Sequence, residues 1–459
     1  MKNSIILNVD SYKTSHYLQY PAGATQVSSY IESRGGAFEK AVFFGLQMFI
    51  KEYLTKPITA DDIEEAKLVY QAHGVPFNEE GWRYILDKHE GYLPIEIQAA
   101  PEGTVMDVKN VMVQVINTDR NCAWLTSYVE TALLRAVWYP TTVATVSWSC
   151  RNIIKRYLEE TADTIEGLPF KLHDFGARGA SSEETAAIGG AAHLVNFMGT
   201  DTVSGIMAAR RYYGADMAGF SIPAAEHSTI TSWGKEAEVD AYANMLEQFA
   251  EPGKLVAVVS DSYDLWNAID NLWGEALKTK IERSGGTLVV RPDSGDPVAI
   301  VTETIERLMR KFGFTVNSKG YRVLPACIRV IQGDGISLHT IEAILAAMKA
   351  RKQSAENIAF GMGGELLQKV NRDTLKFAMK ASAICVKGIW RDVYKDPITD
   401  QGKRSKKGLL ALVKDLDGGF QTVRRQDLGN REDQLVTVFR NGDLMKEWTF
   451  DEVRANAAQ

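Results

Sequence analysis

Long apolar runs are missing from this sequence of 459 residues, and so are the short motifs of several large enzyme classes. No stretch of about 18 apolar residues occurs, so we expect no membrane-spanning helix. The apolar segment 5–9 is too short for the core of a signal peptide, which favours a cytoplasmic protein. A GxxxxGK[ST] loop and an HExxH motif are also absent, which argues against a P-loop enzyme and a zinc hydrolase.

Cysteine is scarce, and positive charge is not in excess. The four cysteines lie far apart and form no CxxC pair, so the sequence indicates neither a zinc site nor a disulfide framework. Reduced thiols in the cytosol are the expectation. The formal net charge is -6. Because general nucleic-acid binders neutralise phosphates with basic side chains, we expect no nucleic-acid partner.

The pattern of predicted secondary structure divides the chain into three regions. Residues 1–145 contain short segments in which apolar and polar residues alternate, as in strands, and 381–459 show the same pattern with hairpin turns. Between them, in 146–380, strand-like runs alternate with helical ones, which indicates parallel βα units. We therefore predict an α/β protein, in which an irregular (β/α) barrel over 146–380 is accompanied by a β-rich domain built from both chain ends. The expected strands are 170–172, a short one near 199, 220–222, 255–259, 287–290, 328–331 and 357–360.

Each predicted strand of the central region is followed by a polar segment that core packing does not require. Any one of them could be a helix cap, but seven in the same register are hard to explain by capping. The carboxyl ends of barrel strands meet on one face, where catalytic loops lie. We therefore expect a shared active site. The segments are 173–178, 199–202, 226–228, 260–264, 291–297, 332–335 and 361–364.

The residue types in these segments favour a phosphorylated sugar as ligand. Arg178 and Arg291 offer planar forks that hold phosphate oxygens in two parallel bonds. The glycine-rich loop 361–364 precedes a predicted helix and leaves backbone N–H groups open to an anion. Asp293 and Asp334 would repel phosphate, so they suit sugar hydroxyls or a magnesium ion.

The same motifs resemble those of the nicotinamide phosphoribosyltransferase family. The resemblance implies a homodimer of the type II phosphoribosyltransferase fold, with each active site at the dimer interface. It implies the substrates nicotinamide and phosphoribosyl pyrophosphate, a requirement for Mg²⁺, and an ATPase cycle through a phosphohistidine. The matching segments are 10–13, 173–176, 199–202, 223–228, 260–264, 291–295, 332–335 and 403–408.

Carried over to this sequence, the resemblance makes His227 the phosphorylated histidine, assisted by Glu226 and oriented by Asp261. Phe175 and, from the partner subunit, Tyr12 would sandwich the pyridine ring. Asp201, with Ser221 beside the substrate, would accept a hydrogen bond from the carboxamide. Because nicotinate carries a carboxylate that Asp201 would repel, Asp201 favours nicotinamide as the base.

The remaining residues implied by the resemblance bind the donor. Arg178, Arg291 and His227 would hold the pyrophosphate, while Asp293 and the Gly333–Asp334 turn would bind the ribose hydroxyls. The 5′-phosphate and further phosphate contacts are assigned to Gly363, Gly364, Arg34, Arg372, Lys380 and Lys395.

Four positions depart from the family pattern, and three other functions stay open. The departures are Ala177, Met362, Glu365 and Ala378. The nearest alternative is a nicotinate phosphoribosyltransferase on the same fold. A phosphosugar isomerase or aldolase would need a Schiff-base lysine or a buried glutamate pair at the strand ends, and neither is visible. A non-catalytic relative would be indicated by loss of Arg178, Asp201 or His227, and all three are present.

Overall fold

The computed structural model describes residues 4–399, 404–415 and 417–459, and the chain divides into two compact units. Unit 1 consists of Met1–Thr145, Ala208–Ala215 and Val370–Gln459, and unit 2 of Val146–Met207 and Asp216–Lys369. The boundaries differ from the expected 146–380 at two places, because 208–215 and 370–380 belong to unit 1. Lys403, in one of the basic motifs, lies outside the described residues.

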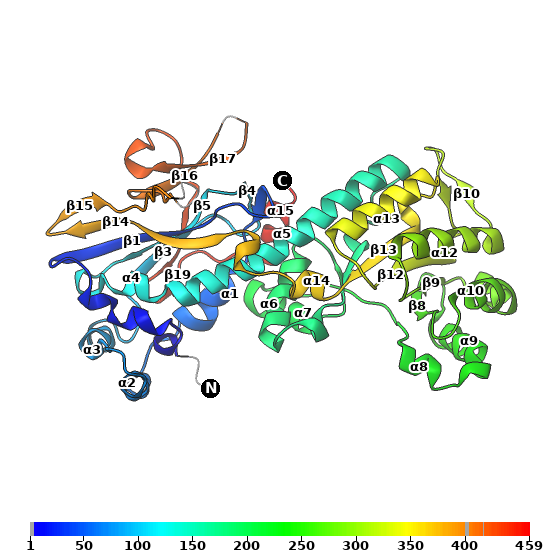
Figure 1. The fold of residues 1–459 in the computed structure, drawn as a ribbon, viewed down its shortest axis with the longest axis horizontal. Coiled ribbons are helices and arrows are strands. Elements are labelled where there is room, and N and C mark those ends of the chain that lie inside the picture. The colour runs from blue at the N-terminus through cyan, green and yellow to red at the C-terminus, as the bar shows by residue number, and fades with distance from the viewer. Residues whose placement is uncertain (1–3, 400–403, 416) are drawn as a thin grey trace. The chain divides into compact units, whose positions relative to one another are not determined.

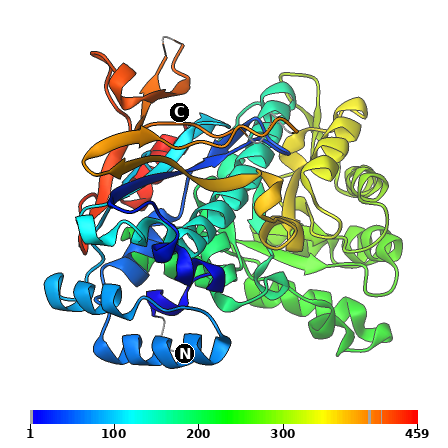
Figure 2. The same cartoon turned by 60° about the vertical axis from the view of Figure 1, so that its left-hand side comes forward.

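Unit 1 is built on a seven-stranded sheet with the order β15-β14-β1-β5-β3-β18-β19. Strand β1 (Ala24–Ser33), near the amino terminus, pairs in antiparallel register with β14 (Phe377–Val386), and both views show the blue and orange strands side by side (Figures 1 and 2). The β-rich domain built from both chain ends is therefore confirmed. The other strands of unit 1 are β2 (Lys40–Val42), β3 (Ile95–Ala99), β4 (Val105–Asp107), β5 (Val111–Asn117), β15 (Ile389–Asp392), β16 (Leu410–Lys414), β17 (Phe420–Arg424), β18 (Val436–Arg440) and β19 (Asp443–Leu444).

Helix α2 (Ala60–His73) begins and ends at local sequence signals. Thr59 and Asp62 form a capping box, and Gly74 ends the helix in the left-handed conformation with φ 84°. The other helices of unit 1 are α1 (Leu46–Phe49), α3 (Glu79–Lys88), α4 (Leu125–Tyr128) and α15 (Phe450–Ala457), and α5 (Glu130–Thr161) continues into unit 2.

Unit 2 contains a parallel six-stranded sheet with the order β7-β6-β13-β12-β9-β8. The two edge strands are joined through the segment 220–224, which makes a parallel bridge to β7 at Gly199↔Phe220 and another to β8 at Ala224↔Ala257. This segment closes the ring, as expected for an irregular barrel rather than an open sheet. The strands are β6 (Leu172–Asp174), β7 (Gly199–Thr200), β8 (Leu255–Val259), β9 (Thr287–Arg291), β12 (Ile328–Gln332) and β13 (Ile358–Met362), and a small hairpin consists of β10 (Thr315–Val316) and β11 (Arg322–Val323).

Helices follow the strands of unit 2, and Figure 1 shows α12 and α13 running beside β12 and β13. The cap of α12 is Asp296, which accepts from Ala299 N and precedes a proline that suits the first helical turn. Over the described part of the chain, none of the helices combines the length and apolar character that crossing a membrane requires. The helices are α6 (Glu183–Leu194), α8 (His227–Thr231), α9 (Glu238–Phe249), α10 (Leu265–Asn267), α11 (Lys278–Ser284), α12 (Pro297–Phe312), α13 (Leu338–Ala350) and α14 (Gly364–Leu367), and α7 (Val203–Tyr213) continues into unit 1.

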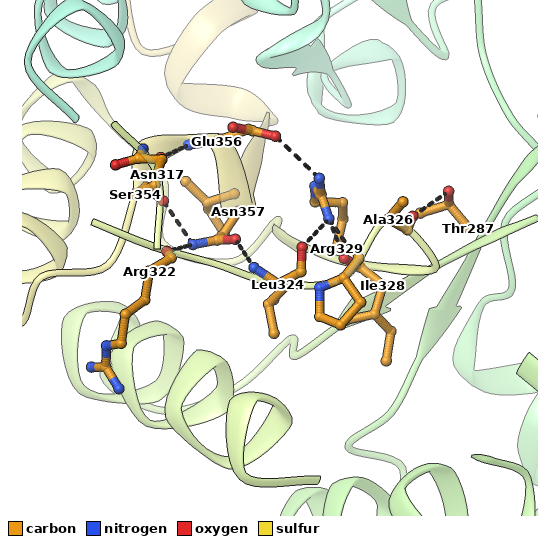
Figure 3. A network of polar contacts seen from close by, with 12 residues as sticks. Thr287, Asn317, Arg322, Leu324, Ala326, Ile328, Arg329, Ser354, Glu356 and Asn357 are labelled. Carbon is orange, nitrogen blue, oxygen red and sulfur yellow. Dashed lines mark hydrogen bonds and ion pairs between the residues drawn. The ribbon is translucent and has the colours of Figure 1, made fainter. Parts of the chain in front are cut away.

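A polar network lies at the amino ends of β12 and β13 (Figure 3). The buried Asn357 accepts from Leu324 N at 2.8 Å and donates to the carbonyls of Arg322 and Ser354 at 2.9 and 3.0 Å. Arg329 donates to three backbone carbonyls and to Glu356. These bonds satisfy loop backbone that burial removes from water, so this end of the barrel is fixed by structure and the opposite end is left for ligands.

Candidate active site

The carboxyl ends of the barrel strands bring the predicted site residues of unit 2 to one edge. In chain order, the strand that supplies each group is β6 for Phe175 and Arg178, β7 for Asp201, the segment 220–224 for Ser221, Glu226 and His227, β8 for Asp261, β9 for Arg291 and Asp293, β12 for Gly333 and Asp334, and β13 for Gly363 and Gly364. Parallel pairing alone imposes this convergence, since every strand ends at the same edge.

His227 begins α8 and is joined to the carboxylate of Asp261. The distance from His227 Nε2 to Asp261 Oδ1 is 3.0 Å, and the His227 side chain is 46% exposed. Asp261 Oδ2 accepts from Asp293 N at 3.0 Å and from Ser294 Oγ at 2.5 Å. Burial opposes ionisation of Asp261, but the hydrogen bonds from Ser294 and His227 outweigh it, so its pKa is lowered. His227 is thus held by a fixed anion, with its other ring nitrogen, Nδ1, 3.9 Å from Asp293 Oδ2.

Glu226 precedes the histidine at the start of α8. Its backbone N–H donates to Thr229 Oγ1 at 3.3 Å, and its carboxylate accepts from Ser228 Oγ. These are contacts of a helix cap. The structure therefore gives Glu226 a role in positioning the first turn of α8, and with it His227.

Arg291 is a half-buried guanidinium at the end of β9. Its Nη2 donates to Asp293 Oδ2 at 2.9 Å, and its Cζ lies 5.7 Å from the centroid of the Phe175 ring. Arg291 Nε is buried without a hydrogen-bond partner among the described residues. A buried donor that lacks a protein acceptor is suited to an anionic ligand.

The ring of Phe175 lies against glycine backbone. A β-carbon on Gly361 would stand 2.0 Å from Phe175 Cε2, and one on Gly333 would stand 3.1 Å from the same atom. The 361–364 segment was predicted to be an anion-binding loop, but Gly361 and Met362 belong to β13, and only Gly363 and Gly364 follow it. The first glycine of the motif therefore makes room for an aromatic platform, and that part of the prediction is wrong.

Asp201 is held at the edge of this platform by two donors. Asp201 Oδ1 lies 3.0 Å from His173 Nε2 and accepts from Ser221 Oγ. Burial opposes ionisation of Asp201, but these hydrogen bonds and the positive charge of Arg291 outweigh it, and its pKa is lowered. His173 was absent from the predicted site. Its position at the head of the 173–178 segment was the signal that could have included it.

The loop after β13 is the predicted phosphate site. A β-carbon on Gly364 would meet no heavy atom within 4 Å. A β-carbon on Gly179, the residue after Arg178, would stand 3.5 Å from Gly364 Cα. Arg178 is exposed and makes no hydrogen bond or ion pair with another described residue. An unpaired guanidinium beside open glycine backbone is able to bind an anionic group.

In unit 1, three of the predicted basic residues lie close together. Burial lowers the pKa of Lys380, and the charges of Arg34, Lys13 and Lys395 lower it further, while Glu130 opposes them. Arg34 Nε is paired with Glu32 Oε1 at 3.2 Å, and the remaining mutual repulsion of these cations would be relieved by an anion. Lys13 was not predicted. Its partner is Glu130, 2.6 Å away.

Two other predicted residues of unit 1, Arg372 and Tyr12, are exposed. Arg372 is paired with Asp373 at 3.2 Å. Tyr12 is 61% exposed, and its ring packs edge-to-face with that of His16, with 5.2 Å between the ring centroids. An exposed aromatic ring on an anchored segment is available for stacking.

No group of three or more His, Cys, Asp or Glu side chains within the described ranges is arranged to hold a metal ion. The carboxylates nearest to His227 are already engaged, since both oxygens of Asp261 and Oδ2 of Asp293 accept hydrogen bonds. The donor set therefore fits a Mg²⁺ ion only if most of its ligands are oxygens of a phosphorylated substrate.

Two descriptions of known families match this chain. The nicotinate phosphoribosyltransferase (NAPRTase) family matches residues 170–443, and the N-terminal domain of nicotinamide phosphoribosyltransferase matches residues 4–97. The chain belongs to the NAPRTase family.

Relatives within this family share the full length of the chain. A protein of Xanthomonas campestris pv. campestris (strain 8004), named nicotinamide phosphoribosyltransferase, is 55% identical over 461 residues, which cover 99% of this chain and 98% of the relative. A protein of the same name from Acinetobacter baylyi is 33% identical over 487 residues, which cover 98% and 96%.

Solved structures support the fold of this NAPRTase-family chain. A nicotinate-nucleotide pyrophosphorylase from Pyrococcus furiosus superposes with a TM-score of 0.64 at 17% identity, covering 100% of this chain and 96% of that one. Human nicotinic acid phosphoribosyltransferase gives 0.57 at 16% identity, covering 98% and 92%. The α/β fold with a barrel of the type II phosphoribosyltransferases and a β-rich domain is thereby confirmed.

The four departures from the family pattern leave the site groups in place. Met362 is fully buried as the last residue of β13, and Ala177 is exposed in the turn that precedes Arg178. Glu365 forms an ion pair with Lys369, which offsets its charge near the glycine loop. Ala378 lies in β14, within the strand that carries Lys380.

Proposed function

We propose that this chain transfers the phosphoribosyl group of phosphoribosyl pyrophosphate to nicotinamide, with nicotinamide mononucleotide and pyrophosphate as products. The observation that carries the proposal is the state of Asp201. Its Oδ1 is occupied by His173 and Ser221, and its lowered pKa keeps the carboxylate ionised. Oδ2 then remains as an acceptor for a neutral carboxamide N–H, whereas the carboxylate of nicotinate would be repelled. The name of the relative that is 55% identical supports the same base.

The chemistry follows from the positions of the strand-end groups. The pyridine stacks on Phe175, and its nitrogen attacks the anomeric carbon while pyrophosphate leaves. Arg178 and Arg291 supply fixed positive charge for the leaving group without reorganisation, which lowers the barrier because charge develops there. Asp293 and the Gly333–Asp334 turn bind the ribose hydroxyls, and positioning supplies much of the remaining acceleration.

Magnesium is part of the proposal as a companion of the donor. When bound, Mg²⁺ neutralises charge on the pyrophosphate oxygens. Asp293 Oδ1, which accepts no hydrogen bond from another described residue, is the protein oxygen best placed to join its ligands. The other ligands would be oxygens of the substrate and water.

ATP is proposed as a co-substrate that phosphorylates His227. Since Nε2 is hydrogen-bonded to Asp261, Nδ1 keeps its lone pair for the γ-phosphorus of ATP, from which ADP departs. Water later cleaves the P–N bond and releases phosphate. A phosphoryl group on His227 adds nearly two negative charges beside Arg291 and changes the affinity for the donor.

A homodimer with shared active sites completes the proposal. It would bring Tyr12 and the cationic cluster of Arg34, Lys380 and Lys395 to the partner's barrel. A mixture of Tyr12→Ala and Asp201→Ala variants tests this, since hybrid dimers regain one intact site and up to about a quarter of the activity. If the mixture stays inactive after subunit exchange, the sites are not shared. A cytoplasmic location, which the four free thiols suit, is tested by cell fractionation.

The base is settled by measuring product formation from both bases in the purified full-length protein, with and without ATP. We expect turnover of nicotinamide, and a loss of preference for it in Asp201→Asn. A preference of the unmutated protein for nicotinate would instead make it a nicotinate phosphoribosyltransferase, the alternative activity on this fold.

A further inference from the structure

A buried carboxylate of unit 1 lies beside the cationic cluster of Arg34, Lys380 and Lys395. Glu32 is 3% exposed and lies near the end of β1, which runs between β14 and β5 in the sheet. Removal of a carboxylate from water is costly unless charged donors compensate it. The partners of Glu32 therefore decide what this buried charge does.

Each oxygen of Glu32 accepts from a different cation. Oε1 accepts from Arg34 Nε at 3.2 Å, and Oε2 accepts from Lys406 Nζ at 2.6 Å. The hydroxyl of Tyr30 donates to Oε1 at 3.4 Å and accepts from Lys406 N at 2.8 Å. Lys406 is thus fixed through its ammonium group and through its backbone, so the segment around it is tied to β1.

The segment that contains Lys406 in turn holds Lys395. Ser405 N donates to the carbonyl of Lys395 at 2.9 Å, and Lys395 N donates to Ser405 Oγ at 2.8 Å. Ser405 is itself buried. Glu32 therefore supports two of the three cations of the cluster, because it contacts Arg34 directly and reaches Lys395 through Lys406 and Ser405.

The two cations that contact Glu32 differ in what they leave for a ligand. Arg34 Nη2 is buried and has no hydrogen-bond partner among the described residues. A guanidinium held at Nε presents its outer nitrogens in a fixed direction, which suits a phosphate oxygen. The ammonium of Lys406 is instead engaged by Glu32 and by the carbonyl of Lys109 at 2.6 Å. Arg34 is the ligand-binding group of this pair, and Lys406 is a support.

We propose that Glu32 is a positioning residue for the donor, which sets the direction of the Arg34 guanidinium and, through Lys406 and Ser405, the backbone at Lys395. The inference rests on the proposed function, in which the cationic cluster binds phosphates of the donor. Glu32 carries the wrong charge to bind a phosphate, so it acts through the groups that it holds. Fixing long side chains in advance lowers the entropic cost of binding the donor.

The test uses the sign of the effect, because charge and position act in opposite directions. Glu32→Gln removes a negative charge beside the cluster, and this alone would strengthen the binding of a polyanion. The substitution also weakens the hold on Arg34 and Lys406, and we expect that loss to dominate. In the full-length protein, the calorimetric Kd of phosphoribosyl pyrophosphate with Mg²⁺ and the KM of this donor should rise roughly tenfold, while the KM of nicotinamide stays within about twofold.

Ser405→Ala tests the second contact without a change of charge. It removes the side-chain acceptor of Lys395 N, and we expect the Kd of the donor to rise a few-fold. Glu96→Gln is the matched control on the same sheet. The Glu96 side chain is 14% exposed and accepts from Arg440 Nε at 2.8 Å, and neither residue belongs to the cationic cluster. We expect the Kd of the donor to be unchanged in this control.

A donor Kd in Glu32→Gln that is unchanged or lower would overturn the inference, and so would an equal rise of KM for both substrates, which would leave Glu32 a structural residue. If Glu32→Gln does not fold, Ser405→Ala decides, and an unchanged donor Kd in that variant would overturn the inference. Failure of the proposed function would be visible separately, as an unmutated protein that binds the donor but does not turn over nicotinamide.

Discussion

The backbone of Gly361 lies so close to the ring of Phe175 that a β-carbon at Gly361 would stand 2.0 Å from Phe175 Cε2. Strand β13 can therefore pass under the platform only where it has no side chain. Because Phe175 also faces Arg291 and His173, its position sets the distance between the base and the groups that bind the donor.

Substitution of Gly361 tests this relationship. In Gly361→Ala the ring must move, so we expect KM for nicotinamide to rise at least about tenfold and the free energy of unfolding to fall by about 1–3 kcal/mol. Gly167→Ala is the matched control. Gly167 has φ -72°, and the nearest atom to an added β-carbon is Lys171 Cε at 3.7 Å. Equal kinetics in Gly361→Ala and the control would contradict the role of the platform.

The Asp261 carboxylate predicts a graded loss of ATP hydrolysis. Asp261→Asn removes the anion that holds His227 Nε2 and orients the ring, so we expect ATPase activity to fall by roughly 10²-fold or more. In Ser294→Ala, Asp261 Oδ2 still accepts from Asp293 N, and we expect a loss of only a few-fold. Phosphate release from ATP measures both, and trapped phosphohistidine should disappear in parallel. An Asp261→Asn variant with full ATPase activity would contradict the proposed phosphohistidine.

Much of this site could be predicted because parallel strands share an edge. The segments that contain Asp201, His227 and Arg291 were identified from their place after strand-like runs, and the pairing of the strands brings these segments to one edge. The roles of Asp201 and His227 came from the family resemblance. Capping signals also transfer directly from sequence, as at Thr59 and Asp62, since they depend on contacts three residues apart.

Features that depend on distant contacts could not be predicted. The end of β13 extends to Met362 because Gly361 and Met362 pair with β6, and no local signal separates such a strand end from a loop. Residues 208–215 belong to unit 1 because Tyr213 donates to the buried Glu102 and the Tyr212 carbonyl accepts from Lys51. Tertiary hydrogen bonds of this kind override the helical pattern that continues through α7.

The buried charge of Asp174 predicts an unusual dependence of stability on pH. Its pKa is about 6 in the folded protein, against 3.8 for an ordinary aspartate. When the pKa of an acid is higher in the folded than in the unfolded protein, the protonated group favours folding. This stabilisation is lost as pH rises from 3.8 through 6. At 1.36 kcal/mol per pKa unit, the loss is roughly 3 kcal/mol above pH 6.

Asp174→Asn should therefore be more stable than the unmutated protein at pH 8 and nearly equal to it at pH 4. Thermal or urea unfolding at the two values, with the difference between the proteins taken at each pH, measures the effect. The comparison at each pH removes the contributions of the other titrating groups. At each pH, the measured quantity is the free energy of unfolding of Asp174→Asn minus that of the unmutated protein. If this difference is smaller at pH 8 than at pH 4, the Asp174 carboxylate is compensated in the folded state.

The amino ends of the barrel strands give the last prediction, because their polar network lies at the edge opposite the site. Replacement of Asn357 by Leu leaves Leu324 N and the carbonyls of Arg322 and Ser354 without their partner. We expect the free energy of unfolding to fall by about 2–4 kcal/mol. Asn271→Ala is the control, since Asn271 is exposed and its side chain donates to Asn267 Oδ1, four residues earlier in the chain, at 2.8 Å. Chemical denaturation gives the stability, and KM for both substrates in the folded fraction should stay within about twofold, because the network contacts none of the strand-end groups. A large change in KM with little loss of stability would show that the two ends of the barrel are coupled.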